Sequence, residues 1–543
     1  MELALQLETQ SDLPLHQQIY DQLRDAILSG DLRSQQRLPA SRYLAQTLGV
    51  SRTTVTQSYD QLIIEGYLET RVGAGTFVCS QLPEELLEAY RPEVTADAED
   101  SDAGYDENSS ALGLGEISLS DYGDRLIQTP DRVFSPKAEL SFVYGVPALD
   151  HFPVKRWRQL WNRYATANVD WMGYATDPMG YMPLRSQIAE YIAQVRALRC
   201  GPEQILITNG TQQALSLIVR VLIDAASSAR DMQADAIAIE NPGYVSARRI
   251  FSSSGAQLVP IPVDSGGMVI DGPNGLRSQS TKRPVKLVYV TPSHQFPTGV
   301  LMPLSRRLAL LQWAQENNAI IIEDDYDSEF RYSGRPTPAL QGLDSYGQVL
   351  YVGTFSKVMF PGLRLGYVVL PPALVPLFRR SKWLADRQCS LIDQQTLTSF
   401  IADGHMSKHI RRMRNLYAGR RRVLIQRLHE AFACSRKPGE ATGDAQNESV
   451  EILGDEAGLH VMAKLPLRRS DAQVIADAQS LGVTLFSARS QYLSETEGGF
   501  VGSLQALTND SHTDSQGEFI FGFGHISEQS IGEAFDRMAS VFA

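Results

Sequence analysis

The chain has 543 residues, more than one hydrophobic core usually supports, which excludes a single small domain and predicts two or three domains. Hydrophobic residues make up 43% and charged residues 21%, as in ordinary soluble globular proteins. The net charge of −12 argues against a uniformly basic nucleic-acid-binding protein. However, ten acidic residues and one Arg lie within 84–107, so a basic face elsewhere is compatible with this composition.

The four cysteines lie far apart and form no CxxC pair. We therefore expect neither a metal site nor a disulfide framework, and a reduced cytosolic setting. The N-terminus lacks the basic segment and apolar core of a signal peptide. No apolar run approaches the roughly 20 residues that span a bilayer. We expect a soluble, cytoplasmic protein without a membrane partner.

The first zone of the chain, residues 12–79, is dense with short helical patterns. Apolar residues recur every four positions from Leu15 to Ile27 and predict an amphipathic helix. A second, short helix is predicted to begin at Ser41 and to break at Gly49, and Ser51 is suited to cap a third helix. Helix, glycine-containing turn and helix are typical of a helix-turn-helix, whose second helix enters the major groove of DNA.

The third helix has an apolar side and a polar side. The polar side carries Arg52, Thr53, Thr56 and Gln57. An Arg there can bond guanine, and Thr can contact phosphate or the thymine methyl group. The following YLETRVGAGTFV predicts two strands around a Gly-rich turn, a wing that brings Arg71 to the minor groove or to phosphates. The alternative is a small helical domain with an unrelated surface, because helix-turn-helix patterns also arise by chance.

This segment resembles the GntR-type winged helix. The family pattern of LP-x-x-R, then G-V-S-R-x-T-V, then G-x-G-T-x-V is present in order between residues 38 and 78. The resemblance implies binding to double-stranded operator DNA, with contacts by Arg42, Ser51, Arg52, Thr53, Thr54 and Gly73. Residues 31–59 carry four arginines and one acid, so the face is locally basic.

Three further zones follow. Residues 80–137 are acidic and poor in large apolar residues, a composition that predicts a flexible linker. Residues 138–420 alternate helical stretches with short β-branched runs such as VKLVYV and AIIIEDD, which predicts a mostly parallel sheet covered by helices on both faces. Residues 421–543 change pattern and predict a smaller α+β subdomain.

The segment GTFSKVMFPGLRLGY (353–367) carries the strongest chemical signal. A predicted strand delivers Lys357, which, when partly desolvated, has a lowered pKa and can form a Schiff base with an aldehyde. Arg364 and the hydroxyls of Thr354 and Ser356 are suited to a phosphate group. Any single Lys is more often an ordinary surface residue, so other motifs have to support this interpretation.

Three other motifs provide that support. In ITNGTQQAL, Gly210 and Thr211 open a helix whose N-terminus can bind an anion. IIIEDDYDSEF ends a buried strand in a carboxylate cluster, and one carboxylate there can hold a pyridine nitrogen protonated. ENPGY presents Tyr244 as a candidate for stacking on a ring. Each signal is weak alone, and the acids are equally compatible with a solvated strand end.

In this order the motifs resemble those of fold-type-I aminotransferases over roughly residues 140–543. With the winged helix in front, the chain resembles the MocR subfamily of GntR regulators. The specific shared strings are SHQFPTG, EDDYDSEFR and TFSK…PGLRLGY. The implied fold is multidomain: an N-terminal winged helix-turn-helix (α+β) and an α/β fold-type-I aminotransferase-like domain that depends on pyridoxal 5′-phosphate.

The resemblance also implies roles for single residues. Lys357 forms the internal aldimine, Asp324 pairs with the pyridine nitrogen and Tyr326 bonds the 3′-oxygen, while Tyr244 stacks on the ring. The phosphate is held by Gly210, Thr211, Ser356 and Arg364. Tyr174 resembles the tyrosine that reaches the phosphate of the neighbouring subunit, which implies a head-to-tail homodimer.

The chain departs from aminotransferases at two places. Phe296 stands where they have Asn before Pro-Thr-Gly, and EFIFGFGHI (518–526) lacks their carboxylate-binding Arg. We therefore expect a transcription regulator that senses pyridoxal phosphate or a small amine. The alternatives are an active aminotransferase with an appended DNA-binding module, and a DNA-binding protein whose large domain only dimerises.

Overall fold

The structure is a computed structural model. It describes residues 5–8, 13–71, 73–82, 119–127, 129, 140–167, 169–174, 177–225, 234–282, 284–334, 337–433, 449–454, 456–467, 469–493 and 517–542. The chain divides into two compact units, residues 1–111 and 112–543. Most of the predicted acidic linker lies outside the described residues.

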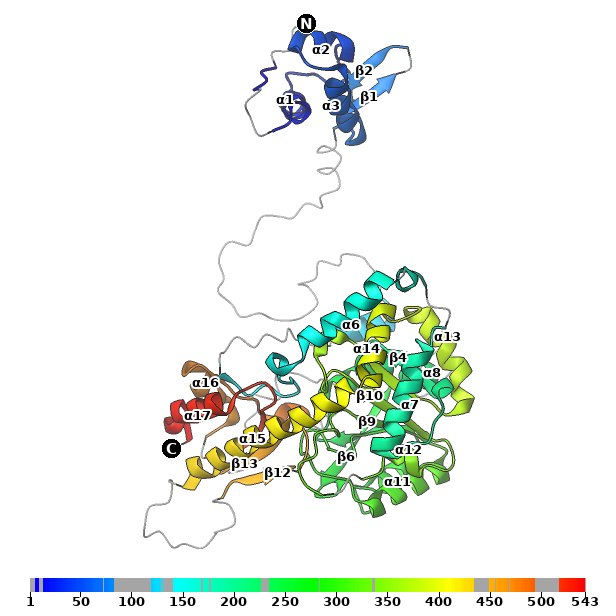
Figure 1. The fold of residues 1–543 in the computed structure, drawn as a ribbon, viewed down its shortest axis with the longest axis vertical. Helices are drawn as coiled ribbons and strands as arrows, with labels where there is room; N and C mark the ends of the chain where they lie inside the picture. The colour runs from blue at the N-terminus through cyan, green and yellow to red at the C-terminus, as the bar shows by residue number, and fades with distance from the viewer. Residues whose placement is uncertain are drawn as a thin grey trace. The chain divides into compact units, whose positions relative to one another are not determined.

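The first unit contains three helices and a hairpin (Figure 1). Its elements are α1 (Leu15–Leu28), α2 (Ser41–Leu48), α3 (Arg52–Ile64), β1 (Leu68–Arg71) and β2 (Gly75–Val78). The strands are antiparallel, with Leu68 opposite Val78. Ile19, Val55 and Leu62 are fully buried in one core between the three helices. The predicted helix-turn-helix and hairpin are confirmed.

The second unit is built on a mixed sheet of eight strands in the order β4-β11-β10-β9-β8-β5-β6-β7. Strand β11 is antiparallel to β4 and β10, and β7 is antiparallel to β6; β5, β6, β8, β9 and β10 pair in parallel. The strands are β4 (Ile205–Thr208), β5 (Ala236–Asn241), β6 (Gln257–Asp264), β7 (Gly267–Met268), β8 (Val285–Val290), β9 (Ile320–Asp325), β10 (Val349–Thr354) and β11 (Gly366–Val369).

Helices cover both faces of this sheet, because alternate strand residues are apolar on both sides. Ile237 packs in the core that includes α8, α9 and α13, whereas its neighbour Ala238 packs in the core that includes α10, α11 and α12. Helices α6, α7 and α14 pack near β4 and β11. The helices are α6 (Val154–Ala167), α7 (Met182–Arg196), α8 (Thr211–Leu222), α9 (Val245–Ser253), α10 (Leu276–Lys282), α11 (Leu304–Asn317), α12 (Leu340–Leu343), α13 (Val375–Ala385) and α14 (Leu391–Ala402).

A smaller α+β part follows and has its own core. It contains a three-stranded antiparallel sheet in the order β12-β13-β15, and the short β14 pairs with β3. The elements are β3 (Leu140–Ser141), α15 (His405–Ala433), β12 (Glu451–Leu453), β13 (His460–Leu465), α16 (Asp471–Ser480), β14 (Val483–Thr484), β15 (Gly517–Gly522), α17 (Glu528–Arg537) and α18 (Ala539–Phe542).

Two of the predicted boundaries differ from the structure. The boundary between residues 420 and 421 falls inside α15, because this helix runs from one core to the other: Ile410 near its start packs in the core of the large sheet, and Leu424 further along packs in that of the smaller part. Residues 121–127 of the predicted linker form α5 (Asp121–Ile127), whose Arg125 Nε donates to the carbonyl of Ser253 at 2.8 Å. This segment therefore packs on the second unit.

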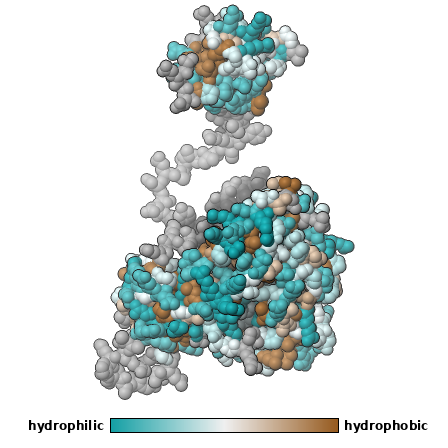
Figure 2. All heavy atoms as spheres, in the orientation of Figure 1, coloured by the Kyte–Doolittle hydropathy of each residue, from teal (hydrophilic) through white to brown (hydrophobic). Residues whose placement is uncertain are grey.

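Among the described residues, no helix is long and apolar enough to cross a membrane. Figure 2 shows a largely hydrophilic visible face on the second unit, with apolar side chains in separate patches. The most exposed apolar side chains of this unit include Val169, Tyr174 and Leu384, at 69%, 79% and 76% exposure.

The packing of α3 predicts a stability difference between two of its residues. Leu62→Ala removes a fully buried side chain and should destabilise the first unit by about 2–5 kcal/mol. Ile64→Ala, on the same helix but 84% exposed, should change stability by no more than about 0.5 kcal/mol. Differential scanning calorimetry of the full chain checks both, and equal losses would contradict this packing.

Candidate functional site

A cavity of about 480 Å³ opens at the carboxyl-terminal edge of the large sheet. The parallel strands of the sheet end at this edge, and open α/β sheets bind their ligands there. The structure brings eight of the predicted site residues together there: Thr211, Tyr244, Asp324, Tyr326, Thr354, Ser356, Lys357 and Arg364.

Lys357 follows β10 and extends its amine into this cavity. Its Nζ donates to the carbonyl of Gly145 at 2.7 Å. Gly145 has φ +77°, a backbone conformation that favours glycine, and a Cβ at this position would lie 2.6 Å from Nζ and displace the amine. Burial lowers the pKa of Lys357, while Asp327 and Asp324 act in the opposite direction. A lowered pKa increases the fraction of neutral amine, the nucleophilic form.

Asp324 lies near the end of β9 and is buried. The hydroxyl of Tyr289, on the adjacent β8, donates to Oδ2 at 2.7 Å, whereas Oδ1 is buried without a hydrogen-bond partner. Burial raises the pKa of Asp324 to about 7, and the Tyr289 hydrogen bond opposes that rise. A buried carboxylate oxygen without a donor is costly, so this atom is suited to a cationic N–H group from a ligand.

The opposite end of the cavity is suited to an anion. Helix α8 begins at Thr211 after Gly210, whose φ of +83° turns the chain from β4 into the helix. Its N-terminus adds a partial positive charge and free N–H groups. Arg364 lies against this turn: its Nη2 donates to the carbonyl of Asn209 at 2.9 Å, and its guanidinium lies 3.5 Å from a Cβ placed on Gly210. The hydroxyls of Thr354 and Ser356 also line this cavity.

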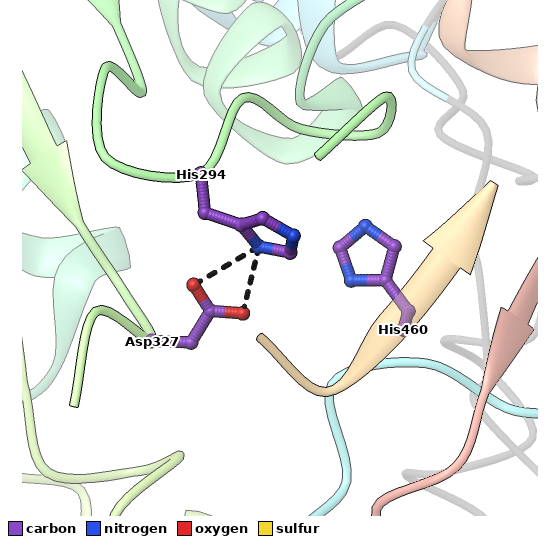
Figure 3. Close-up of side chains that lie close together, drawn as sticks. All are labelled: His294, Asp327 and His460. Carbon is purple, nitrogen blue, oxygen red and sulfur yellow. Dashed lines mark hydrogen bonds and ion pairs between the residues drawn. The ribbon is translucent and has the colours of Figure 1, made fainter. Parts of the chain in front are cut away.

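The hydroxyl of Tyr326 is part of a hydrogen-bonded group on the cavity wall. It lies 2.9 Å from Nδ1 of His294, which also lies 3.1 Å from a carboxylate oxygen of Asp327. Figure 3 shows His294 between Asp327 and His460. Burial holds the pKa of His460 well below its usual range, so its ring is neutral, and its Nε2 lies 3.1 Å from the carbonyl of Pro297.

Donor atoms of these three residues lie within 4.8 Å of one another and are of types that bind metals. However, Nδ1 of His294 and Nε2 of His460 already have hydrogen-bond partners. Nε2 of His294 is buried without a partner, while the contacts of its Nδ1 form a hydrogen-bonded network that orients Tyr326.

Tyr244 lies between β5 and α9, at the N-cap of α9, and its side chain lines the cavity. The ring of Phe296 lies edge-on to that of Tyr244, with centroids 5.7 Å apart, and also packs against Tyr144 at 5.4 Å. Phe296, which stands where aminotransferases have Asn, thus contributes to an aromatic wall and supplies no hydrogen bond from its side chain.

Tyr174 is the one predicted cofactor residue that lies outside the cavity and away from it. It is exposed, and the guanidinium of Arg387 lies 4.9 Å from its ring centroid. Its expected role toward a neighbouring subunit stays a prediction.

Sequence reasoning missed several residues of the site. Tyr289 lies on the strand before that of Asp324, and its hydrogen bond to Asp324 depends on how the two strands pair. Gly145 accepts a hydrogen bond from Lys357 although the two residues are 212 positions apart in the sequence. Arg249 lines the cavity one helical turn after Ser246, at a position with no motif to mark it. The string SHQFPTG was part of the resemblance, but nothing in it assigned a role to His294.

The first unit presents the predicted DNA contacts on its surface. The residues Arg42, Ser51, Arg52, Thr53, Gln57, Arg71 and Gly73 are exposed, and Thr54 is half-buried. The Ser51 hydroxyl accepts the N–H of Thr54 at 3.1 Å, so Ser51 caps α3 as expected. The start of α3 therefore carries Arg52 and Thr53 with free side chains on a helix N-terminus, an arrangement suited to bases and phosphates.

Arg71 on the wing is more constrained than expected. Its guanidinium bonds to Glu69 and Gln35 and lies 4.6 Å from the ring centroid of Phe77. Glu69 offsets part of its charge. Arg37, which sequence reasoning did not select, lies against the wing at Gly75, where a Cβ would come within 3.0 Å of its Nε.

Comparison with known proteins agrees with this arrangement. Residues 15–78 match the family of bacterial regulatory proteins of the gntR family, and residues 140–463 match aminotransferase class I and II, a family that depends on pyridoxal phosphate. The probable rhizopine catabolism regulatory protein MocR of Rhizobium meliloti is 35% identical over 99% of this chain and 96% of its own length. The pyridoxine biosynthesis transcriptional regulator PdxR of Corynebacterium glutamicum is 32% identical over 79% of this chain and 82% of its own.

A solved structure shares the fold of the second unit. Pyrococcus horikoshii kynurenine aminotransferase, crystallised with PMP, matches with a TM-score of 0.61 and 26% identity over 80% of this chain and 96% of its own. The chain therefore belongs to the MocR subfamily of GntR-type transcription regulators, in which a winged helix-turn-helix precedes a fold-type-I aminotransferase-like domain.

Proposed function

We propose that this regulator binds operator DNA through residues 12–79 and holds pyridoxal phosphate in the cavity around Lys357, and that the cofactor or a small amine controls its DNA binding. The observation that carries the proposal is the unpaired, buried Oδ1 of Asp324 in a cavity that also contains a Lys amine and an anion-binding helix terminus. These groups match the three polar ends of pyridoxal phosphate: pyridine nitrogen, aldehyde and phosphate.

Each residue has a distinct task in this proposal. The bound cofactor would be held at its aldehyde by the amine of Lys357, at its pyridine nitrogen by Oδ1 of Asp324, and at its 3′-oxygen by Tyr326, which His294 positions. Gly210, Thr211, Thr354, Ser356 and Arg364 hold the phosphate. When bound, the group supplies an aldehyde that exchanges one primary amine for another. A ligand that binds one arrangement of the protein more tightly shifts the population toward it.

We further propose a homodimer, with the region around Tyr174 at its interface. The Arg387 guanidinium lies over the rings of both Tyr174 and Trp383, at 4.9 and 5.4 Å from their centroids, so these segments adjoin. Val169 and Leu384 add exposed apolar surface in the same segments. Exposed apolar patches mark interaction surfaces, which supports an interface between subunits at this place; the head-to-tail arrangement is what the family implies. Because we propose that the protein acts on DNA, we also propose that it works in the cytoplasm.

An active aminotransferase is the second candidate, favoured by the joint presence of Lys357, Asp324 and Arg364 in the cavity. A steady-state assay against amino acids and keto acids separates the two functions. Repeated turnover at about 1–10³ per second would favour the enzyme, and its absence favours the regulator.

Lys357→Ala should abolish the visible absorbance band that forms when pyridoxal phosphate is added to the full-length protein, because the alanine cannot form the Schiff base. Lys408→Ala, an exposed Lys on α15 outside the cavity, should keep it. A band that persists in the Lys357→Ala protein would exclude this lysine as the attachment point.

Tyr289→Phe should weaken pyridoxal phosphate binding at least about tenfold. It removes the donor that stabilises ionised Asp324, so the pKa of that carboxyl rises further, and a hydrogen bond to a charged group contributes about 1.5–3 kcal/mol. The matched control is Tyr351→Phe, since Tyr351 makes the equivalent bond to the adjacent Asp325 at 2.6 Å, outside the cavity. Fluorescence titration measures both, and equal weakening would disprove a specific role for Tyr289.

Arg52→Ala should weaken binding to a duplex selected from a random pool by about 1–3 kcal/mol, a factor of about 5 to 150 in Kd, because Arg52 lies exposed at the start of α3. Ile64→Ala, at the other end of the same helix, should bind as the wild type does. Fluorescence anisotropy checks both, and if the two variants bind alike, α3 is not the recognition helix.

A further inference from the structure

A second cavity, of about 860 Å³, lies in the same unit. The end of α7, the chain after β9 and the first half of α15 form its walls. It shares no lining residue with the cavity around Lys357, and nothing in the proposed function uses it.

Only short segments of chain separate the two cavities. At the end of β9 and just beyond it, Asp324, Tyr326 and Asp327 line the first cavity, while Ser328 and Glu329 line the second. The same alternation occurs after β8, where residues 291 and 296 line the first cavity and residue 293 lines the second. It occurs again at the start of β13, where residues 459–460 line the first cavity and residue 457 lines the second. A ligand in the second cavity thus contacts the segments that position Asp324, Tyr326 and His294.

The second cavity has an excess of positive charge. Arg414 donates Nε and Nη2 to the backbone carbonyl of Glu329 at 3.2 and 2.8 Å, which orients the guanidinium without neutralising it. No acidic side chain in the described ranges forms an ion pair with Arg411 or Arg414. Arg331 pairs through Nη2 with Glu456 at 3.1 Å, but its Nε is buried without a hydrogen-bond partner.

The acids at this site do not cancel that charge. Asp325 is already paired with Arg196, whose Nε lies 2.7 Å from its carboxylate. Burial raises the pKa of Glu329 to about 7, and Tyr191 donates to this carboxyl at 3.3 Å. At neutral pH, Glu329 therefore carries only part of a negative charge.

We propose that this cavity binds a small organic anion with two or more negative charges, held by Arg331, Arg411 and Arg414, and that its binding alters the cofactor cavity. Guanidinium groups match carboxylate and phosphate oxygens in pairs, which is why three of them around one cavity favour a dianion. The effect on the cofactor rests on the proposed function, whereas the anion site itself does not. Two sites that share the same segments are coupled reciprocally. Each ligand changes the protein's affinity for the other ligand by the same factor.

Isothermal titration calorimetry of the full-length protein tests the site with succinate, glycerol 3-phosphate and uncharged glycerol. We expect at least one of the two anions to bind with a Kd below about 1 mM and glycerol not to bind. The tighter anion distinguishes a dicarboxylate from a phosphate monoester. Arg411→Ala and Arg414→Ala should each weaken this binding at least about tenfold, since each removes a charge-assisted contact.

Arg412→Ala is the matched control. Arg412 is exposed on the same helix, bonds to His151 at 3.1 Å and does not line the cavity, so its removal should change the Kd less than about twofold. Absence of binding by both anions, or equal weakening by Arg411→Ala and Arg412→Ala, would overturn the proposed site.

The coupling is measured separately from the site. The bound anion should shift the Kd for pyridoxal phosphate at least about threefold in the wild type and not in the Arg411→Ala protein. The Lys357→Ala protein should retain the calorimetric signal for the anion. If pyridoxal phosphate fails to bind the wild type, the proposed function is wrong while calorimetry still decides the anion site; if it binds but never responds to a bound anion, only the coupling is wrong.

Discussion

The burial of Asp324 near the end of a central strand is the constraint on which the proposed cofactor site depends. Strand β9 lies between β8 and β10, so its last residues have protein on both sides and little water. A carboxylate in such a place needs donors. Tyr289 supplies one from the neighbouring strand, and the second oxygen has none. The protein thus keeps one polar atom unsatisfied where a ligand cation can satisfy it, beside an amine whose pKa is lowered by the same burial.

The same strand end separates two cavities with different charge. Residues on one side of the segment after Asp324 face the cofactor site, and those on the other side face a group of arginines. Arg196 links the segments on that side, because it bonds both Asp325 and Ser293, the neighbours of Asp324 and His294. An enzyme needs only the first cavity; a regulator gains from a second site whose ligand contacts the same segments, since allostery requires two sites that bias one structural element.

Much of the site could be predicted from sequence because its residues follow strands of high apolar content. Asp324 lies near the end of a predicted strand, and Lys357, Thr211 and Tyr244 each follow one by three residues; parallel strands bring their ends to one edge. Gly145, Tyr289, His294 and Arg249 could not be found in this way, since each acts through a partner that is distant in sequence. The expected role of Arg71 illustrates the same limit: its neighbours Glu69 and Phe77 constrain it only when the two strands of the wing pair.

The sequence by itself determined the class of both units, because helical and strand periodicities and the order of glycine-containing turns are local properties of the chain. It also predicted the chemistry of the proposed cofactor site, from the order of Lys, Asp and Arg near strand ends. Only the tertiary structure decided where the smaller part begins, because Phe142 and Leu424 pack in one core although they are 282 positions apart in the chain. The tertiary structure also showed that one carboxylate oxygen of Asp324 has no hydrogen-bond partner and that a basic cavity adjoins the first. Both findings depend on which side chains contact one another in space, and the sequence does not give these contacts.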